Sequence, residues 1–261
     1  MSKEELAKVY KQIREHPAHR LYLDIEAFFR SMEHVFGANS VELLLLLDQA
    51  ASDTRLALEL VQNAYDDPVR REFNARLDQR LHNYLAATQS LVDHSRRLLD
   101  KLGSGEVHTE FATRLATAQE GDLMPFMIDL RNYTQHRILP TTGVTTRFST
   151  KGASARILLN VAPLRRWKKW SPAAKRWLAA QPDDIDLRTI LVDHHERVWA
   201  LNDRLRVMVA TANEAGQEEV NELIAEAQRL RMRPGTTIEQ AKAAMDENEA
   251  RLSQPRPPKE P

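Results

Sequence analysis

The feature that most constrains the fold is a helical hydrophobic pattern that continues without a break from Asp67 to Gly103. One seam of this segment has heptad-like spacing and carries Leu77, Leu81, Tyr84, Leu91, Leu98 and Leu102, with Thr88 and Ser95 as its polar members. At about 1.5 Å per residue, such a helix is roughly 50 Å long. It can bury its seam only against a neighbour of similar length, so the pattern predicts an antiparallel helical bundle.

Capping signals predict the helices around this one. Asn39 and Glu42 have the spacing of a capping box, and we expect their helix to continue to about Tyr65. Asp67 followed by Pro68 is typical of an N-cap and a first helical position. Further helices are expected over His108–Glu120 and Asp122–Leu139, the second stopped by Pro140, and after the pair Ser171-Pro172. The last ones are expected over Asp184–Asn213, Gln217–Met232 and Thr237–Leu252, where Thr236 and Glu239 form a capping box.

Two β-prone runs interrupt the helical pattern. Residues 143–150 and 155–161 flank Lys151-Gly152 and predict a hairpin. Two strands alone are marginal in water, so the hairpin must dock on helices or on a second copy. The fold class is therefore all-α, a helical bundle with one inserted β-hairpin and additional C-terminal helices. The expected divisions are a bundle over 1–140, the hairpin over 141–164, C-terminal helices over 165–252 that pack on the bundle or form a small lobe, and a disordered tail over 253–261.

Composition excludes several kinds of site. The chain has no cysteine, which rules out disulfides and thiolate chemistry and fits a reducing compartment. The charged segment Met1–Glu5 lacks the apolar core of a signal peptide, and the most apolar stretch, Val41–Leu47, is too short to span a bilayer. We therefore expect a cytoplasmic protein without a membrane partner. Lys plus Arg and Asp plus Glu number 37 each, so any attraction to nucleic acid must be local.

The sharpest chemical signature is the helical segment Arg131-Asn132-Tyr133-Thr134-Gln135-His136. On a helical wheel, an apolar face holds Leu123, Phe126, Met127, Leu130, Tyr133 and Ile138. Arg131, Asn132, Gln135 and His136 lie on the opposite side, so a helix anchored by its apolar face presents them as a polar groove. The loose pattern, an arginine with a histidine four to six residues later, also starts at Arg14, Arg76 and Arg188. The strict pattern Arg-Asn-x-x-x-His occurs once.

This motif at the end of an apolar helix resembles the signature of the HEPN superfamily, the helical ribonucleases and nucleotide-binding proteins of bacterial conflict systems. The resemblance covers residues 21–140 and carries over to Arg131, Asn132 and His136. It implies metal-independent RNA cleavage in a cleft between two copies, in a bacterial defence or toxin system. Ile138 stands where many members carry a tyrosine that some toxin pairs modify, so control by a modifying antitoxin is not implied here.

The chemistry of the residues agrees with that role. Metal-independent cleavage needs a base for the 2′-hydroxyl and a cation for the phosphate. His136 suits the general base or acid and Arg131 the phosphate clamp, with Asn132 and Gln135 as orienting amides and Tyr133 in support. Arg131 and His136 project about 140° apart, so two copies facing each other would bracket a phosphate better than one. The alternative is a non-catalytic helical scaffold that binds a nucleotide or a protein partner through the same groove.

A second candidate is the segment 165–177, called here the basic segment. It contains Arg165, Arg166, Trp167, Lys168, Lys169, Trp170, Lys175, Arg176 and Trp177 and no acid. Cations for phosphates and rings for base stacking would suit single-stranded RNA. The alternative is that the tryptophans anchor the chain in the core while the cations are merely solvated.

Three further groups are assigned structural roles. Asp193-His194-His195-Glu196 lacks metal-ligand spacing, and we interpret it as a solvated or hydrogen-bonded helix surface. Arg80 and His82 flank the seam at Leu81, and the acidic run 214–226 is interpreted as an exposed helical face. We expect no cofactor and no metal. RNA, a second copy and a protein partner such as an antitoxin are the expected partners, the last not identifiable from the sequence.

Overall fold

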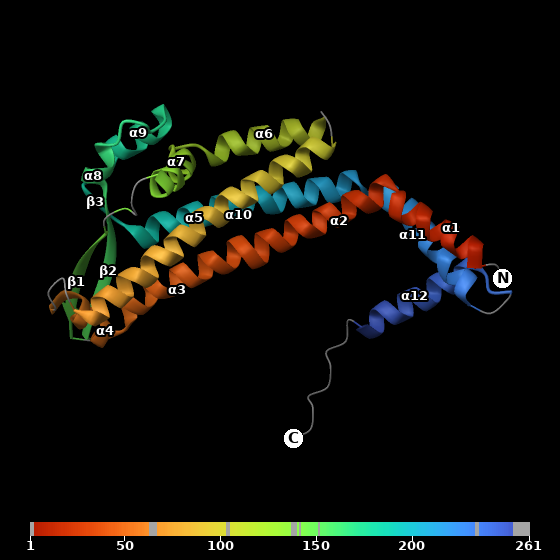
Figure 1. Ribbon diagram of the computed structural model, residues 1–261, viewed down its shortest axis with the longest axis horizontal. Coiled ribbons are helices and arrows are strands. Elements are labelled where there is room, and N and C mark those ends of the chain that lie inside the picture. Colours follow the sequence, from red (N-terminus) through yellow and green to blue (C-terminus); the bar gives the residue numbers. More distant parts are fainter. Residues whose placement is uncertain are drawn as a thin grey trace, which may run out of the picture. The chain divides into compact units, whose positions relative to one another are not determined.

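The computed structural model describes residues 3–62, 67–102, 105–136, 140, 142–150, 152–232 and 235–252, and it is mostly helical (Figure 1). The helices are α1 (Lys3–Glu15), α2 (Pro17–Arg30), the π-helix η1 (Ser31–Gly37), α3 (Ala38–Ser52), α4 (Thr54–Gln62), α5 (Pro68–Leu102), α6 (Glu106–Ala118), α7 (Leu123–His136), α8 (Val161–Arg165), α9 (Pro172–Ala180), α10 (Leu187–Ala212), α11 (Glu214–Arg231) and α12 (Ile238–Leu252). The strands are β1 (Thr142–Ser149), β2 (Gly152–Asn160) and β3 (Asp184–Asp186). An all-α fold with an inserted hairpin is confirmed. Among the described helices, none combines the length and apolarity needed to cross a membrane.

The chain divides into two compact units. The larger unit comprises residues 27–208, and the smaller one joins residues 1–26 to residues 209–261. These boundaries fall inside α2 and α10, whereas the sequence suggested divisions after residues 140 and 164. The difference arises because the two ends of the chain pack together, which no local pattern reveals.

The expected long helix is α5, which runs beside α3 and α10 in the larger unit (Figure 1). Its seam is buried as predicted at Leu77, Leu81, Tyr84, Thr88, Leu91, Ser95 and Leu98. The polar seam residues are satisfied by hydrogen bonds: Ser95 Oγ donates to Asn202 Oδ1 of α10 (2.6 Å), and Thr88 Oγ1 donates to the Tyr84 carbonyl (2.9 Å). Ser95 therefore joins α5 to α10, whereas the Thr88 hydroxyl is satisfied within α5 itself.

The predicted capping box at Asn39 is wrong, because the chain is already helical before this residue. η1 joins α2 and α3 without a break, and Asn39 Nδ2 donates to the carbonyl of Val35 (2.7 Å) inside the continuous helix. The predicted helix also ends early. α3 stops at Ser52, Asp53 is extended, and its carboxylate accepts from the Leu56 amide (3.1 Å) to start α4. The expected end at Tyr65 lies outside the described residues.

Two other N-termini are confirmed. The Asp67 carboxylate accepts from the amides of Val69 (2.8 Å) and Arg70 (3.3 Å) at the start of α5. Ser171 caps α9 by accepting from the Ala174 amide, with Pro172 at the first position. The other ends of the expected helices are shifted by a few residues. Gly103 and residues 137–139, where two helices were expected to end, lie outside the described residues.

The predicted hairpin is confirmed and gains a third strand. β1 pairs with β2 from Thr142↔Leu159 to Ser149↔Gly152, and β3 pairs with β2 on its other side. Residues 184–186 were expected to be helical, so that part of the α10 prediction is wrong. The inner face of β2, at Ala153, Ala155, Ile157 and Leu159, is buried and packs on α3 and α4. Thr54 Oγ1 of α4 donates to the Ala153 carbonyl (3.2 Å).

The smaller unit is built on α1, the start of α2 and α11, and its core contains Val9, Ile13, Ala18, Val220, Ala227 and Leu230. Asn213 Nδ2 donates to the Ala18 carbonyl (3.0 Å). The acidic face of α11 is exposed as predicted at Glu214, Glu218, Glu219 and Glu222.

The capping box of α12 is shifted by one residue from the prediction. The Gln240 amide donates to Thr237 Oγ1 (3.2 Å), and the Thr237 amide donates to Gln240 Oε1 (3.0 Å). The predicted box at Thr236 and Glu239 is therefore replaced by Thr237 and Gln240, which have the same spacing and the same residue classes. The expected disordered tail, 253–261, lies outside the described residues.

Candidate nucleic-acid interface

α7 carries the Arg-Asn-x-x-x-His motif and is anchored by the apolar face that the sequence predicted. Leu123, Met124, Phe126, Met127, Leu130 and Tyr133 are buried. The helix packs on α5 and α9 of the larger unit. Asp122 precedes it with a φ of 60°, and its carbonyl accepts from the Phe126 amide (3.1 Å). α7 is therefore fixed on one side and free to present its other side.

The motif residues differ in accessibility. Gln135 and His136 are exposed, Arg131 and Asn132 are half-buried, and Tyr133 is buried. Arg131 Nη1 donates to Asn132 Oδ1 (3.3 Å), while Arg131 Nε is buried without a hydrogen-bond partner. Of the described residues, none forms a hydrogen bond or ion pair with the His136 ring. The helix thus offers an accessible imidazole and, about 140° around its axis, a guanidinium that pairs with no carboxylate in the described ranges of the chain.

An aromatic cluster joins α7 to the basic segment. Tyr133 stacks on Trp170 (ring centroids 5.6 Å apart) and meets Trp167 edge-on (5.3 Å). Phe126 stacks on Trp177 at 4.0 Å. All three tryptophans are buried, Trp170 with 3 % of its surface exposed. The expectation that these rings stack on RNA bases is therefore wrong, because the rings already stack on α7.

Polar contacts hold the same two segments together. Asp129 of α7 accepts from the Ser171 amide at the N-terminus of α9 (2.7 Å). Asp122 accepts two hydrogen bonds from Arg176, each 2.8 Å long. Arg165 forms an ion pair with Asp183 and donates to the Leu178 carbonyl (3.1 Å). Arg165 and Arg176 therefore have structural partners, and their charges are largely neutralised.

Four cations of the basic segment remain uncommitted. Arg166, Lys168, Lys169 and Lys175 are exposed, and over the described parts of the chain none of them forms a hydrogen bond or an ion pair. They belong to the segment whose tryptophans pack on α7, so four exposed cations lie in the part of the chain that contacts the motif helix. Such a surface is suited to a polyanion.

The histidine pair of α10 is not the helix surface that the sequence suggested. His194 is buried with 1 % of its surface exposed, and its Nδ1 lies 2.6 Å from the Tyr84 hydroxyl. His195 stacks on Phe36 (5.3 Å). Burial lowers the pKa of both imidazoles, that of His194 to about 3. In the described part of the chain, no cluster of three acidic or histidine side chains is suited to a metal.

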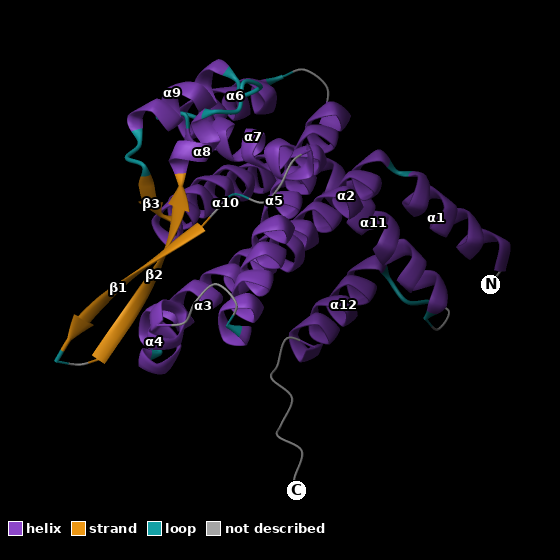
Figure 2. Cartoon of the chain, turned by 60° about the vertical axis from the view of Figure 1, so that its left-hand side comes forward, coloured by secondary structure: helices purple, strands orange, loops and turns teal. Residues whose placement is uncertain are grey.

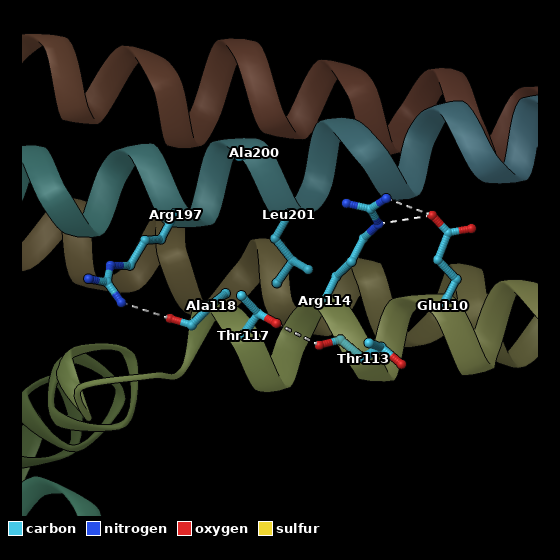
Figure 3. A pocket seen from close by; sticks show the side chains of 8 residues that line it. All are labelled: Glu110, Thr113, Arg114, Thr117, Ala118, Arg197, Ala200 and Leu201. Atoms are coloured by element: carbon cyan, nitrogen blue, oxygen red, sulfur yellow. Dashed lines mark hydrogen bonds and ion pairs between the residues drawn. The ribbon is translucent and has the colours of Figure 1, made fainter.

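Sequence reasoning missed a groove of about 610 Å³ between α6 and α10 (Figure 3). Its lining includes Thr117, Ala118, Ala200 and Leu201. At one end Glu110 accepts from Arg204 and Arg114, which lower the pKa of its carboxyl; at the other, Arg197 donates to the Ala118 and Glu120 carbonyls. No sequence signal could have found it, because its two walls lie about 80 residues apart. Its charged groups are already engaged with one another.

Comparisons with protein-family models, with curated proteins and with solved structures gave no match to this chain. The function therefore has to be inferred from the residues themselves, and the strongest grouping is α7 with the basic segment.

Proposed function

We propose that the chain is a metal-independent endoribonuclease of the HEPN type that acts as a homodimer and binds RNA on the surface formed by α7 and the basic segment. One observation carries this proposal. The two segments that separately suggested RNA chemistry pack together through Tyr133, Trp167 and Trp170, with the rings inside and unpaired cations outside.

Each group in this surface has a defined task. Arg166, Lys168, Lys169 and Lys175 attract the RNA backbone through its phosphates. His136 takes the proton of a 2′-hydroxyl, since its ring is exposed and has no competing partner among the described residues. Arg131 stabilises the charge that builds on the phosphate, and Asn132, which already bonds to it, orients the guanidinium. Arg131 and His136 of one helix project about 140° apart, so they cannot both contact one phosphate well. A second copy would place its own motif residues on the other side of that phosphate.

The test is cleavage of single-stranded RNA in the presence of a chelator. The 2′-oxygen bonds to phosphorus as the bond to the 5′-oxygen of the next nucleotide breaks, and that oxygen takes up a proton. We therefore expect cleavage that leaves 2′,3′-cyclic phosphate and 5′-hydroxyl ends. His136→Ala and Arg131→Ala should each lower the rate about 100-fold or more. His82→Ala is the matched control, since His82 is also an exposed histidine of the larger unit but lies on α5. RNA left intact by correctly folded wild-type protein would contradict the proposal.

The second candidate function is a non-catalytic scaffold that binds a nucleotide or a protein partner through the same surface. It is favoured by the mutual hydrogen bond of Arg131 and Asn132 and by their half-burial, which a structural role also explains. RNA that is bound but not cut, with equal binding by wild type and His136→Ala, would support this candidate.

A further inference from the structure

β1 is an open edge of the three-stranded sheet. The strand order is β1-β2-β3, so β1 pairs with β2 on one side, and no described strand lies on its other side (Figure 2). Its eight residues pair with β2 in an unbroken register, without a bulge, and contain no proline or lysine. Bulges, prolines, charged side chains and a covering helix are the features that normally stop one edge from pairing with another. Of these, β1 has one charged side chain, Arg147, and a contact with α4.

The register fixes which backbone groups face outward. Ser149 and Gly152 flank a two-residue turn and must form a hydrogen-bonded pair, and such pairs alternate along an antiparallel ladder. The odd-numbered residues of β1 thus bond to β2. The amides and carbonyls of Val144, Thr146 and Phe148 point away from β2, toward the open edge.

Two of these three side chains, those of Thr146 and Phe148, are also incompletely accommodated. They lie on the same face of the sheet as the buried residues of β2 that oppose them. The Phe148 side chain is nevertheless 67 % exposed, and the hydroxyl of Thr146 is buried without a hydrogen-bond partner. An added strand would cover the ring and offer the hydroxyl a partner.

We propose that β1 pairs antiparallel with β1 of a second copy, about a two-fold axis at Thr146. In this register Val144 of each copy lies opposite Phe148 of the other, and the two Thr146 residues face each other. Aromatic–β-branched and Thr–Thr pairs are among the stabilising cross-strand pairs. The outward backbone groups of Val144, Thr146 and Phe148 are then all bonded.

Self-complementarity is the reason to assign a second copy to this edge. Moving the axis to Thr145 would place Phe148 opposite Thr142, and moving it to Arg147 would place the two guanidinium groups opposite each other. The register centred on Thr146 instead pairs Arg147 with Thr145. It matches the apolar side chains and separates the like charges, which are directly destabilising when opposed.

This interface does not depend on RNA cleavage. In the proposed register the two Thr142 residues lie about 27 Å apart along the sheet, at about 3.4 Å per residue. Each α7 precedes its β1 by a few residues, so the two motif helices join the sheet from opposite ends. The β1 dimer therefore keeps the two motif surfaces separate, so it is a different interface from the one at which two α7 helices would face each other across a phosphate. Its association is measured without RNA.

The first experiment is sedimentation velocity of the full chain over a range of concentrations. We expect a dimer for the wild type and a dissociation constant raised about tenfold or more for Phe148→Glu. Leu45→Glu is the matched control, since Leu45 is an equally exposed apolar side chain (62 %) of α3 in the same unit. A monomeric wild type, or equal weakening by Leu45→Glu, would overturn the proposal. Circular dichroism verifies that both variants are folded.

The second experiment tests the register by disulfide formation, which is possible because the chain contains no cysteine of its own. Thr145→Cys and Arg147→Cys chains are mixed under mild oxidation. The proposed register brings residue 145 of one copy opposite residue 147 of the other, so mixed dimers should exceed either homodimer. A preference for Thr145→Cys homodimers, or the absence of any cross-link, would overturn this register.

Discussion

The His194 imidazole is the clearest case of a side chain whose surroundings decide its chemistry. It lies inside the α5–α10 interface with Nδ1 against the Tyr84 hydroxyl, and its Nε2 is buried without a partner. Desolvation lowers its pKa from 6.5 to about 3, and the neighbouring His195 and Arg197 act in the same direction against Asp193. The neutral ring is therefore the form that the folded chain retains.

The first prediction is that acid weakens the fold through this residue. Between about pH 6.5 and pH 3 the unfolded chain binds a proton at His194 that the folded chain does not. Lowering the pH in this range should thus lower the free energy of unfolding by roughly 1.4 kcal/mol per pH unit from this residue. The double variant Tyr84→Phe/His194→Leu removes the group together with its partner. Urea titrations that give the same pH slope for the variant and the wild type would contradict the assignment.

Gly152 provides the second prediction at this scale. It has a φ of +121°, and a Cβ placed there would lie 2.4 Å from Thr54 Oγ1. Gly152→Ala should therefore lower the free energy of unfolding by about 2–3 kcal/mol. Gly143→Ala is the control, because its Cβ would meet no atom closer than 4.0 Å. Equal midpoints for the two variants in urea would show that β2 does not approach α4 as closely as described.

Among the elements, the contact between α7 and α9 matters most for the candidate site. The third prediction concerns Asp129, whose carboxylate accepts from the Ser171 amide at 2.7 Å. Asp129→Ala leaves this amide without its acceptor and should cost about 1–2 kcal/mol of unfolding free energy. Asp129→Asn keeps an oxygen acceptor and should cost less. If the two variants are equally stable, the hydrogen bond contributes little to joining the helices.

Elements that depend on local signals could be predicted from the sequence. Asp67-Pro68 and Ser171-Pro172 begin helices as expected, because a cap needs only the residues that follow it. Residues 184–186 were misassigned since their strand forms only by pairing with β2, more than 20 residues away. The helix start predicted at Asn39 was wrong for a related reason. The capping pattern is present in the sequence, but the preceding helix continues through it.

The candidate site was predicted in part. The apolar face of α7 and the exposure of Gln135 and His136 follow from helical periodicity, which the sequence shows directly. The role of the tryptophans could not be predicted. Rings alternate with cations in the sequence both when the rings stack on RNA bases and when they are buried against a helix. Only the contacts of Tyr133 and Phe126, more than 30 residues away, settle their burial.

The fourth prediction concerns the whole molecule: the two compact units unfold separately. A Cβ on Gly216 would lie 2.7 Å from Ala18 Cβ, in the smaller unit, so Gly216→Ala should destabilise it although alanine usually favours a helix. All four tryptophans, at 167, 170, 177 and 199, belong to the larger unit. The variant should therefore shift part of the far-ultraviolet circular dichroism transition while the tryptophan fluorescence transition stays unchanged. A parallel shift of both signals would show that the units unfold together.

The balance of charge also belongs to this scale. With 37 basic and 37 acidic residues, the chain as a whole gives RNA no net attraction. Most of the charged contacts described above are ion pairs within the chain. A cation paired with a carboxylate contributes little net attraction for a polyanion such as RNA. Binding of RNA beside α7 would therefore depend on Arg166, Lys168, Lys169 and Lys175, which form no ion pair with any residue that the structure describes.

The most direct test is the affinity for a fluorescently labelled single-stranded RNA, measured by anisotropy at several salt concentrations. We expect Lys168→Glu/Lys169→Glu to weaken binding at least about tenfold and to flatten its dependence on salt. Lys8→Glu/Lys11→Glu, which makes the same charge change at exposed positions of α1, should bind as the wild type does. Equal loss in both double variants, or no binding by the wild type, would contradict the claim that RNA is held beside α7.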